Sequence, residues 1–249
     1  MAVACLNCGT EIKDEFCPHC GQKKEVKKLT WHSLVQEAVH FFSHIEHGFL
    51  STTTQLFLHP GRVIKEYLGG KRKTYYKPIS FFLIWAGFHL LIYELVSSWM
   101  HYENLRTGNS SFGFSKEIGA YVVQHTQVFG LLLIPIEAFF IWIILSRSKM
   151  NYVETLTAAV YISAIIEMLI FFQILIIGLL LQINFFTNWF VLQVEVVYSV
   201  WGFYCIVDLF KRDKIKFLLL RVLLAMIFSF LVYQIASGLI AGFILKMRS

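Results

Sequence analysis

Hydrophobic and polar positions divide this chain into a polar N-terminal third and a largely apolar remainder. A membrane-spanning helix needs about 20 consecutive apolar residues, and runs of this kind begin only near residue 79. They predict five spans, at residues 79–100, 126–145, 157–182, 188–209 and 217–245. The polar N-terminus lacks the charged-then-apolar layout of a cleaved signal peptide, so the first span would act as the insertion signal. The pattern therefore predicts an all-α polytopic membrane protein.

Amphipathic helices are predicted between the N-terminus and the first span. Thr30 could cap a helix over residues 31–50. One arc of this helix carries a carboxylate and three imidazoles, from Glu37, His40, His44 and His47. That face could bind a second metal ion or respond to pH. The alternative is a helix that lies at the membrane interface with its histidines on the wet side.

A second, shorter helix is expected between a proline and a pair of glycines. Pro60 suits the first turn of a helix over residues 61–68, and Gly69 with Gly70 would end it. Three cations follow directly, at Lys71, Arg72 and Lys73. We expect them to meet the phosphates of anionic lipid headgroups. The stretch lacks the spacing and the Ser or Thr of a nucleotide-binding loop.

Composition and charge also indicate a membrane location. The chain is 57% hydrophobic and 15% charged, whereas average soluble domains are about 25% charged. Basic residues gather before residue 78 and in the loops at 146–156 and 211–216. The positive-inside rule then places these segments in the cytoplasm and the C-terminus outside. The basic last four residues oppose this pattern, so the last span could be re-entrant or broken. Because the N-terminal lysines flank a membrane span, nucleic acid is not expected as a partner.

Two closely spaced cysteine pairs near the N-terminus predict a metal site. The pairs are Cys5 with Cys8 and Cys17 with Cys20. A glycine follows each pair and allows a tight turn. Four thiolates suit tetrahedral Zn2+, so we predict a small structural zinc ribbon that its metal folds. Disulfides would need an oxidising compartment, and a redox motif would normally be a single pair. The chain then divides into a zinc ribbon (1–22), a linker with interfacial helices (23–77) and a transmembrane bundle (78–249).

Three stretches between residue 5 and residue 90 carry a family resemblance: "CLNCG", "FCPHCGQ" and "IEHGFLSTTTQLFLHPGRVIKEYLGGKRKTYYKPISFFLI". They resemble an uncharacterised membrane family of Bacteroidota with an N-terminal zinc ribbon and several spans. Its members have no established activity, so the resemblance implies a bacterial membrane protein and no particular reaction. The layout is also similar, distantly, to five-span Yip1-type proteins, which implies membrane organisation or trafficking.

Ionisable residues interrupt the predicted spans. They are His89, Glu94, Glu137, Glu167, Glu195 and Arg221. A charge at the bilayer centre costs about 2.5–3.5 kcal/mol on insertion scales, so such groups should face one another or water. One interpretation is a polar cavity for a proton, a metal ion, a small solute or a lipid headgroup. The other is structural, with protonated glutamates hydrogen-bonding between helices and Arg221 paired or snorkelling.

These features favour a transporter or a scaffold over an enzyme. The sequence contains no Gly-x-Ser-x-Gly and no His-Glu-x-x-His motif. The intramembrane groups favour handling of a small ion, a solute or a headgroup. A zinc ribbon can instead dock a cytoplasmic protein partner, which would fit a scaffold or regulator. Either kind of protein could form a homo-oligomer. We expect a multi-pass protein of a bacterial cytoplasmic membrane, with structural Zn2+ as its cofactor.

Overall fold

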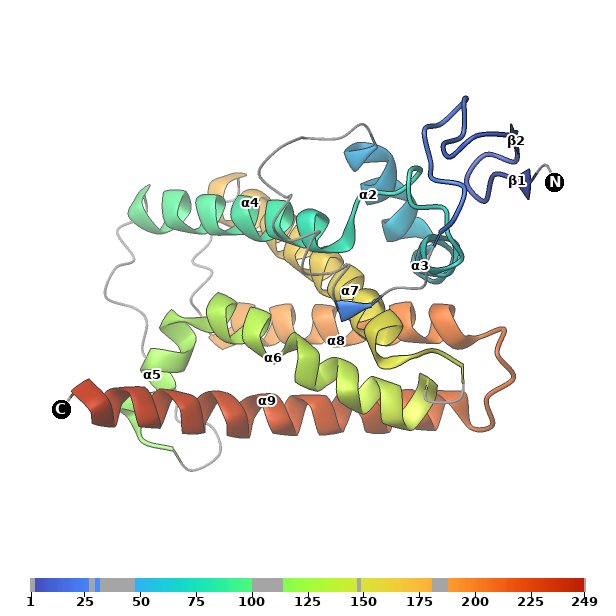
Figure 1. Cartoon of the computed structure of the whole chain (residues 1–249). Helices are drawn as coiled ribbons and strands as arrows, with labels where there is room; N and C mark the ends of the chain where they lie inside the picture. Colours follow the sequence, from blue (N-terminus) through green and yellow to red (C-terminus); the bar gives the residue numbers. More distant parts are fainter. Residues whose placement is uncertain are drawn as a thin grey trace.

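Long helices form the body of the protein, and a small two-stranded ribbon lies at one end of them (Figure 1). The structure is a computed structural model, and it describes residues 3–26, 30–31, 48–99, 114–146, 149–180 and 188–248. The side chains predicted to form a second metal or pH-sensing face lie outside the described residues: Glu37, His40, His44 and His47.

The ribbon consists of two short halves. β1 (Val3–Ala4) pairs antiparallel with β2 (Glu11–Ile12), and Val3 stands opposite Ile12. An isolated antiparallel bridge between Phe16 and Lys23 closes the second half. Isolated hairpins are marginally stable in water even when they are longer than this. Strand pairing alone therefore does not account for an ordered ribbon.

Two short helices connect the ribbon to the bundle. α2 (Phe49–Leu58) and α3 (Pro60–Leu68) meet at His59. As the sequence predicts, α3 has Pro60 in its first turn and ends before Gly69, whose N–H donates to the Lys65 carbonyl at 2.8 Å. The helix is amphipathic, because the residues that it buries lie along one face: Pro60, Gly61, Val63, Ile64 and Tyr67.

The described part of the bundle contains α4 (Pro78–Trp99), α5 (Lys116–Gln124), α6 (Thr126–Ile141), α7 (Tyr152–Gln173), α8 (Asn188–Phe210) and α9 (Leu218–Arg248). α6 continues as a π-helical turn over Trp142–Ser146, and α7 does so over Ile174–Leu180. α4 packs along α7, and α9 packs against both α6 and α8 (Figure 1). Large buried aromatic side chains fill the junction of α3, α4, α7 and α8.

Within the described residues, four helices are long and apolar enough to cross a membrane: Pro78–Trp99, Val128–Leu145, Tyr152–Gly178 and Leu218–Met247. They correspond to four of the five predicted spans. The third begins at Tyr152 instead of residue 157, because Asn151 and Glu154 form a reciprocal capping box there. The remaining predicted span, 188–209, falls on α8, and the described residues of this helix include the apolar stretch Val196–Phe210.

The last predicted span is one continuous helix, α9. The alternative of a broken last span is therefore wrong. α5 is not among the predicted helices: it lies in the loop expected at 101–125, and the Ser115 side chain caps it. Phe114, just before the cap, and Ile118 of α5 lie against two glycines of α9. A Cβ built on Gly238 would be 2.3 Å from the Phe114 ring, and one built on Gly242 would be 3.3 Å from Ile118. Those glycines thus permit the close approach.

The basic segments share one end of the bundle. The ribbon, α3 and the connection from α8 to α9 lie together, and the C-terminus lies at the opposite end (Figure 1). An ion pair joins α3 to the connection between α8 and α9, with Lys65 Nζ 2.8 Å from Asp213 Oδ2. The N-terminal region and the 211–216 loop therefore stand on the same side of the helices.

Candidate metal centre and intramembrane polar groups

Four cysteine sulfurs converge in the ribbon, from Cys5, Cys8, Cys17 and Cys20, and all lie within 4.8 Å of one another. The Sγ atoms of Cys5 and Cys20 are 3.6 Å apart, as are those of Cys8 and Cys17. A tetrahedral zinc site with Zn–S bonds of about 2.3 Å has sulfur–sulfur edges of about 3.8 Å. A disulfide bond would be about 2.05 Å long. The four thiols are free, and their spacing fits a metal ion.

The two halves of the ribbon hold their cysteines in the same way. The Gly9 N–H donates to the Cys5 carbonyl at 2.8 Å, and the Gly21 N–H donates to the Cys17 carbonyl at 2.9 Å. Both glycines have a positive φ, 79° and 68°, which residues with a Cβ rarely adopt. The glycine after each cysteine pair is therefore required by the turn.

The thiols differ in their surroundings. Hydrogen bonds with Thr10 lower the pKa of Cys8 to about 5, whereas burial raises the pKa of Cys20 to about 12. Metal binding needs both as thiolates, and a coordinating cation deprotonates a thiol outright. The site could thus bind a divalent cation through four thiolates, with release of protons.

The ribbon is docked on the loop between α3 and α4, residues 69–77, which we name the base loop. Asn7 Oδ1 accepts hydrogen bonds from the Thr74 N–H at 3.0 Å and from the Thr74 hydroxyl at 2.7 Å. Gln22 Oε1 accepts one from the Arg72 N–H at 3.2 Å. The ribbon is therefore attached to the bundle through side-chain contacts as well as through the chain.

An apolar contact reinforces this docking. Gly70 has a φ of 111°, and a Cβ built on it would lie 2.8 Å from Leu6 Cδ1. Leu6 and Asn7 are the two residues between Cys5 and Cys8. The turn that presents the first two thiols is thus the same turn that holds the base loop.

The three cations expected to contact lipid phosphates have different surroundings. Lys71 Nζ is 3.2 Å from Glu66 Oε2. The Arg72 guanidinium lies 6.0 Å from the centre of the Tyr67 ring. Lys73 is exposed. Two of the three therefore make contacts within the protein, and lipid contact at this segment stays a prediction.

Hydrogen bonds fix the base loop to three helices. The Tyr75 hydroxyl donates to Glu66 Oε2 at 2.5 Å. This bond is the main cause that lowers the pKa of Glu66, while burial and the same carboxylate raise the pKa of Tyr75 to about 12. The Tyr76 N–H donates to Thr52 Oγ1 at 2.9 Å, and the Tyr161 hydroxyl donates to the Tyr76 carbonyl at 2.5 Å. The base loop thus joins α2, α3 and α7.

α3 is tied to α8 by Asp208, a residue that the sequence analysis does not single out. Asp208 Oδ2 accepts a hydrogen bond from the Gly61 N–H at 2.8 Å. The first N–H groups of a helix have no partner within it, and an anion there is favourable. α3 has no side-chain cap of its own. Asp208 therefore supplies the cap from another helix. A local sequence signal could not reveal this, because the two residues are 147 positions apart.

His89 of α4 and Glu167 of α7 form a direct contact within the bundle. Nδ1 and Oε2 are 2.5 Å apart, and the side chains are only 11% and 16% exposed. Tyr198 of α8 lies within electrostatic range of Glu167. Its hydroxyl is buried and has no hydrogen-bond partner among the described residues. Three helices thus bring an imidazole, a carboxylate and a phenol into one region. A paired imidazole and carboxylate can share one proton.

The other predicted intramembrane residues are dispersed. Glu137 of α6 is half-buried and lies within electrostatic range of Tyr233 of α9. Glu94 is exposed on α4, and Glu195 lies on α8. Arg221 is exposed near the start of α9, where a long side chain can reach the helix end. The described side chains of these groups thus do not converge on the one interior site that the sequence predicts.

One segment of the chain is similar to a known family. Residues 46–89 match a family model described as "Protein of unknown function (DUF3667)". Comparisons with curated proteins and with solved structures find no match. The matched segment contains α2, α3, the base loop and the first half of α4 with His89. The likeness therefore covers the platform on which the ribbon docks.

Proposed function

We propose that this chain is a bacterial cytoplasmic-membrane protein with a structural zinc ribbon, and that its bundle binds and releases a proton or a small cation. The zinc assignment is supported by four sulfur ligands at nearly tetrahedral separations. The resemblance to a Bacteroidota-type family supports the bacterial location.

The proposed topology has five spans. α8 is 23 residues long, which corresponds to about 35 Å of helix and suffices for a hydrocarbon core of about 30 Å. Basic segments at the ribbon end support a cytoplasmic N-terminus and an external C-terminus.

A Ser110→Cys variant tests this orientation. An impermeant maleimide should label it in intact cells, because the 101–125 segment follows the first span. The ribbon cysteines would lie in the cytoplasm, and Cys205 is buried. The unsubstituted protein should therefore remain unlabelled and serves as the control. Labelling that appears only after permeabilisation would reverse the orientation.

The proposed ion handling rests on one observation, the His89–Glu167 contact with its low exposure. A charged side chain in a bilayer is unfavourable, and pairs of this kind commonly mark proton and ion pathways. With one proton shared between Nδ1 and Oε2, the pair carries no net charge. When that proton leaves, the pair carries one negative charge and can accept a cation. The nearby Tyr198 hydroxyl, buried without a partner among the described residues, could donate to the carboxylate when the proton leaves.

Purified protein in liposomes with an internal pH dye tests the proposal. Under an imposed membrane potential, the wild type should change the internal pH faster than empty liposomes do. Glu167→Gln should abolish this change. Glu117→Gln is the matched control, because Glu117 is an exposed residue of the first turn of α5. Size-exclusion profiles would show that the variants fold alike. Wild-type protein without any flux of H+, Na+ or K+ would refute ion handling.

A scaffold is the second candidate, and exposed apolar side chains on the ribbon favour it. Val3 is 45% exposed and Phe16 is 48% exposed, although the ribbon itself is docked on the base loop. A cytoplasmic protein could bind this face. A scaffold should tolerate Glu167→Gln in cells but lose its function when residues 1–22 are deleted, whereas an ion-handling protein should fail with Glu167→Gln.

A further inference from the structure

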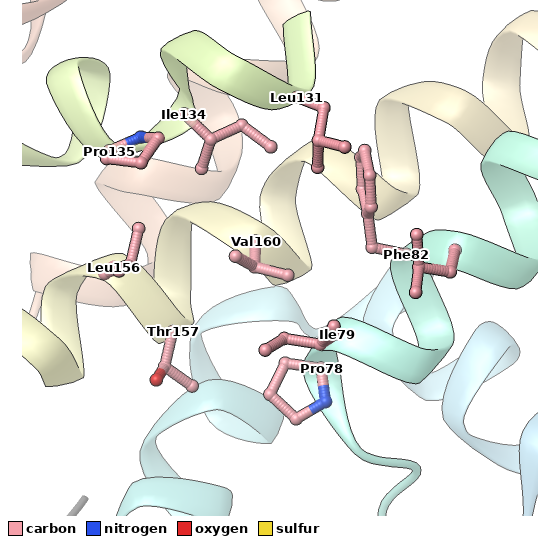
Figure 2. A pocket seen from close by; sticks show the side chains of 10 residues that line it. Pro78, Ile79, Phe82, Leu131, Ile134, Pro135, Leu156, Thr157 and Val160 are labelled. Carbon is pink, nitrogen blue, oxygen red and sulfur yellow. The ribbon is translucent and has the colours of Figure 1, made fainter. Parts of the chain in front are cut away.

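An apolar pocket of about 180 Å3 opens between α4, α6 and α7. Figure 2 shows its walls, which converge from the three helices: Pro78, Ile79, Phe82 and Leu83; Leu131, Ile134 and Pro135; Leu156, Thr157 and Val160. Among the side chains that the structure describes, no predicted intramembrane ionisable residue lines it. The pocket is therefore distinct from the His89–Glu167 pair.

The lining offers almost no hydrogen-bonding capacity. Thr157 is the only residue with a polar side chain in the described lining, and its hydroxyl donates to the Val153 carbonyl at 2.9 Å. Proline has no backbone N–H to offer, which applies to Pro78 and Pro135. A polar solute would lose its hydration in this pocket without replacement. The lining therefore favours a hydrocarbon over a polar solute.

The position of the pocket indicates where that hydrocarbon comes from. Leu156 and Val160 lie four and eight residues after the start of α7 at Tyr152, which is about 6 to 12 Å into the helix at 1.5 Å per residue. Pro78 is the first residue of α4. Leu131, on the wall formed by α6, is 47% exposed, so the pocket communicates with the outside of the bundle, where acyl chains surround a spanning helix.

We propose that this pocket binds an acyl chain of an anionic phospholipid from the leaflet on the ribbon side. An apolar cavity of about 150 Å3 stays dry and takes up benzene, so about 180 Å3 accommodates several methylene groups. Charge supports the headgroup type, because Lys77 directly precedes Pro78 and the exposed Lys149 lies two residues before Asn151, the cap of α7. Lys77 thus adjoins a residue of the pocket wall, and Lys149 precedes the helix end that carries Leu156 and Thr157, so a phosphate of the same lipid would meet positive charge there.

The experiment uses nanodiscs that contain phosphatidylglycerol with a diazirine in its acyl chain. After irradiation and digestion, mass spectrometry locates the labelled residues. Labels should concentrate on the pocket walls of α6 and α7. Val160→Phe places a ring in the pocket and should remove those labels. Val200→Phe is the matched control, because Val200 is 63% exposed on α8, and it should leave them unchanged.

Two results would overturn the proposal. One is labelling of the pocket walls no stronger than that of the exposed faces of α8 and α9. The other is pocket labelling that persists at the wild-type level in a folded Val160→Phe variant. If that variant does not fold, Leu131→Trp at the exposed rim provides the same test, because it obstructs the mouth while leaving the deeper walls unchanged.

Discussion

Replacing Gly61 by alanine should destabilise the protein through a clash between α3 and α8. A Cβ at this position would lie 2.4 Å from the Asp208 carbonyl oxygen and 2.6 Å from the Leu209 nitrogen. Ordinary contact begins at 3.4 Å, so backbone atoms would have to separate by about 1 Å. Overpacking of this kind typically costs about 1–3 kcal/mol. Separation also weakens the Gly61–Asp208 hydrogen bond, and a bond to a charged group contributes about 1.5–3 kcal/mol.

The expected total is about 2.5–6 kcal/mol. For a chain of this size each kcal/mol lowers the melting temperature by about 2–4 °C, so the apparent Tm should fall by about 5–24 °C. Intrinsic fluorescence during heating in detergent would measure the fall at a fixed scan rate. Gly87→Ala and Gly130→Ala are matched controls on α4 and α6, because a Cβ at either position meets nothing within 4 Å.

Those control variants should melt at the wild-type temperature or slightly above, because alanine is about 1 kcal/mol better than glycine inside a helix. A Gly61→Ala protein that melts with the controls would refute the close packing of α3 on α8 and, with it, the capping of α3 by Asp208.

Two other expectations concern the ribbon and the base loop. Cys17→Ser should reduce the zinc content, measured by elemental analysis, from one ion per chain to none. It should also speed hydrogen exchange in the base loop, residues 69–77. Asn7→Ala should speed the same exchange without loss of zinc, because it removes only the contact with the loop. Unchanged zinc in the Cys17 variant would exclude the site. Acid should loosen the base loop: the pKa of Glu66 is lowered in the folded protein, so its contribution is present above the unfolded-state pKa and is lost as the pH falls through the folded-state pKa. Tyr75→Phe, which removes the main cause of the shift, should flatten the pH dependence of exchange in this loop, and an unaltered dependence would contradict the role of Glu66.

Local signals in the sequence predict the local parts of this structure well. The spacing of Cys5, Cys8, Cys17 and Cys20 indicates their convergence, because each pair and its glycine form one turn. Pro60 and the pair of glycines after residue 68 define α3 for the same reason. Four of the predicted spans are recovered because a run of about 20 apolar residues is itself a sufficient signal.

Pairings between distant segments could not be predicted. Nothing near Asn7 indicates that it binds Thr74, and nothing near Asp208 indicates a helix start elsewhere in the chain. The sequence identifies His89 and Glu167 as ionisable groups in apolar runs, but their contact depends on how α4 rotates against α7. Arg221 shows the same limit: whether a residue faces inward is decided by neighbouring helices, and α9 buries few of its residues.

The cap that Asp208 provides has a consequence for how the chain is made. Gly61 and Asp208 are 147 residues apart, and a ribosome adds about 5–20 residues per second. The start of α3 must therefore wait roughly 7–30 s for its partner to be synthesised and inserted. During that interval α3 has been synthesised but lacks the hydrogen bond to Asp208, so the protein can reach its final fold only late in biosynthesis.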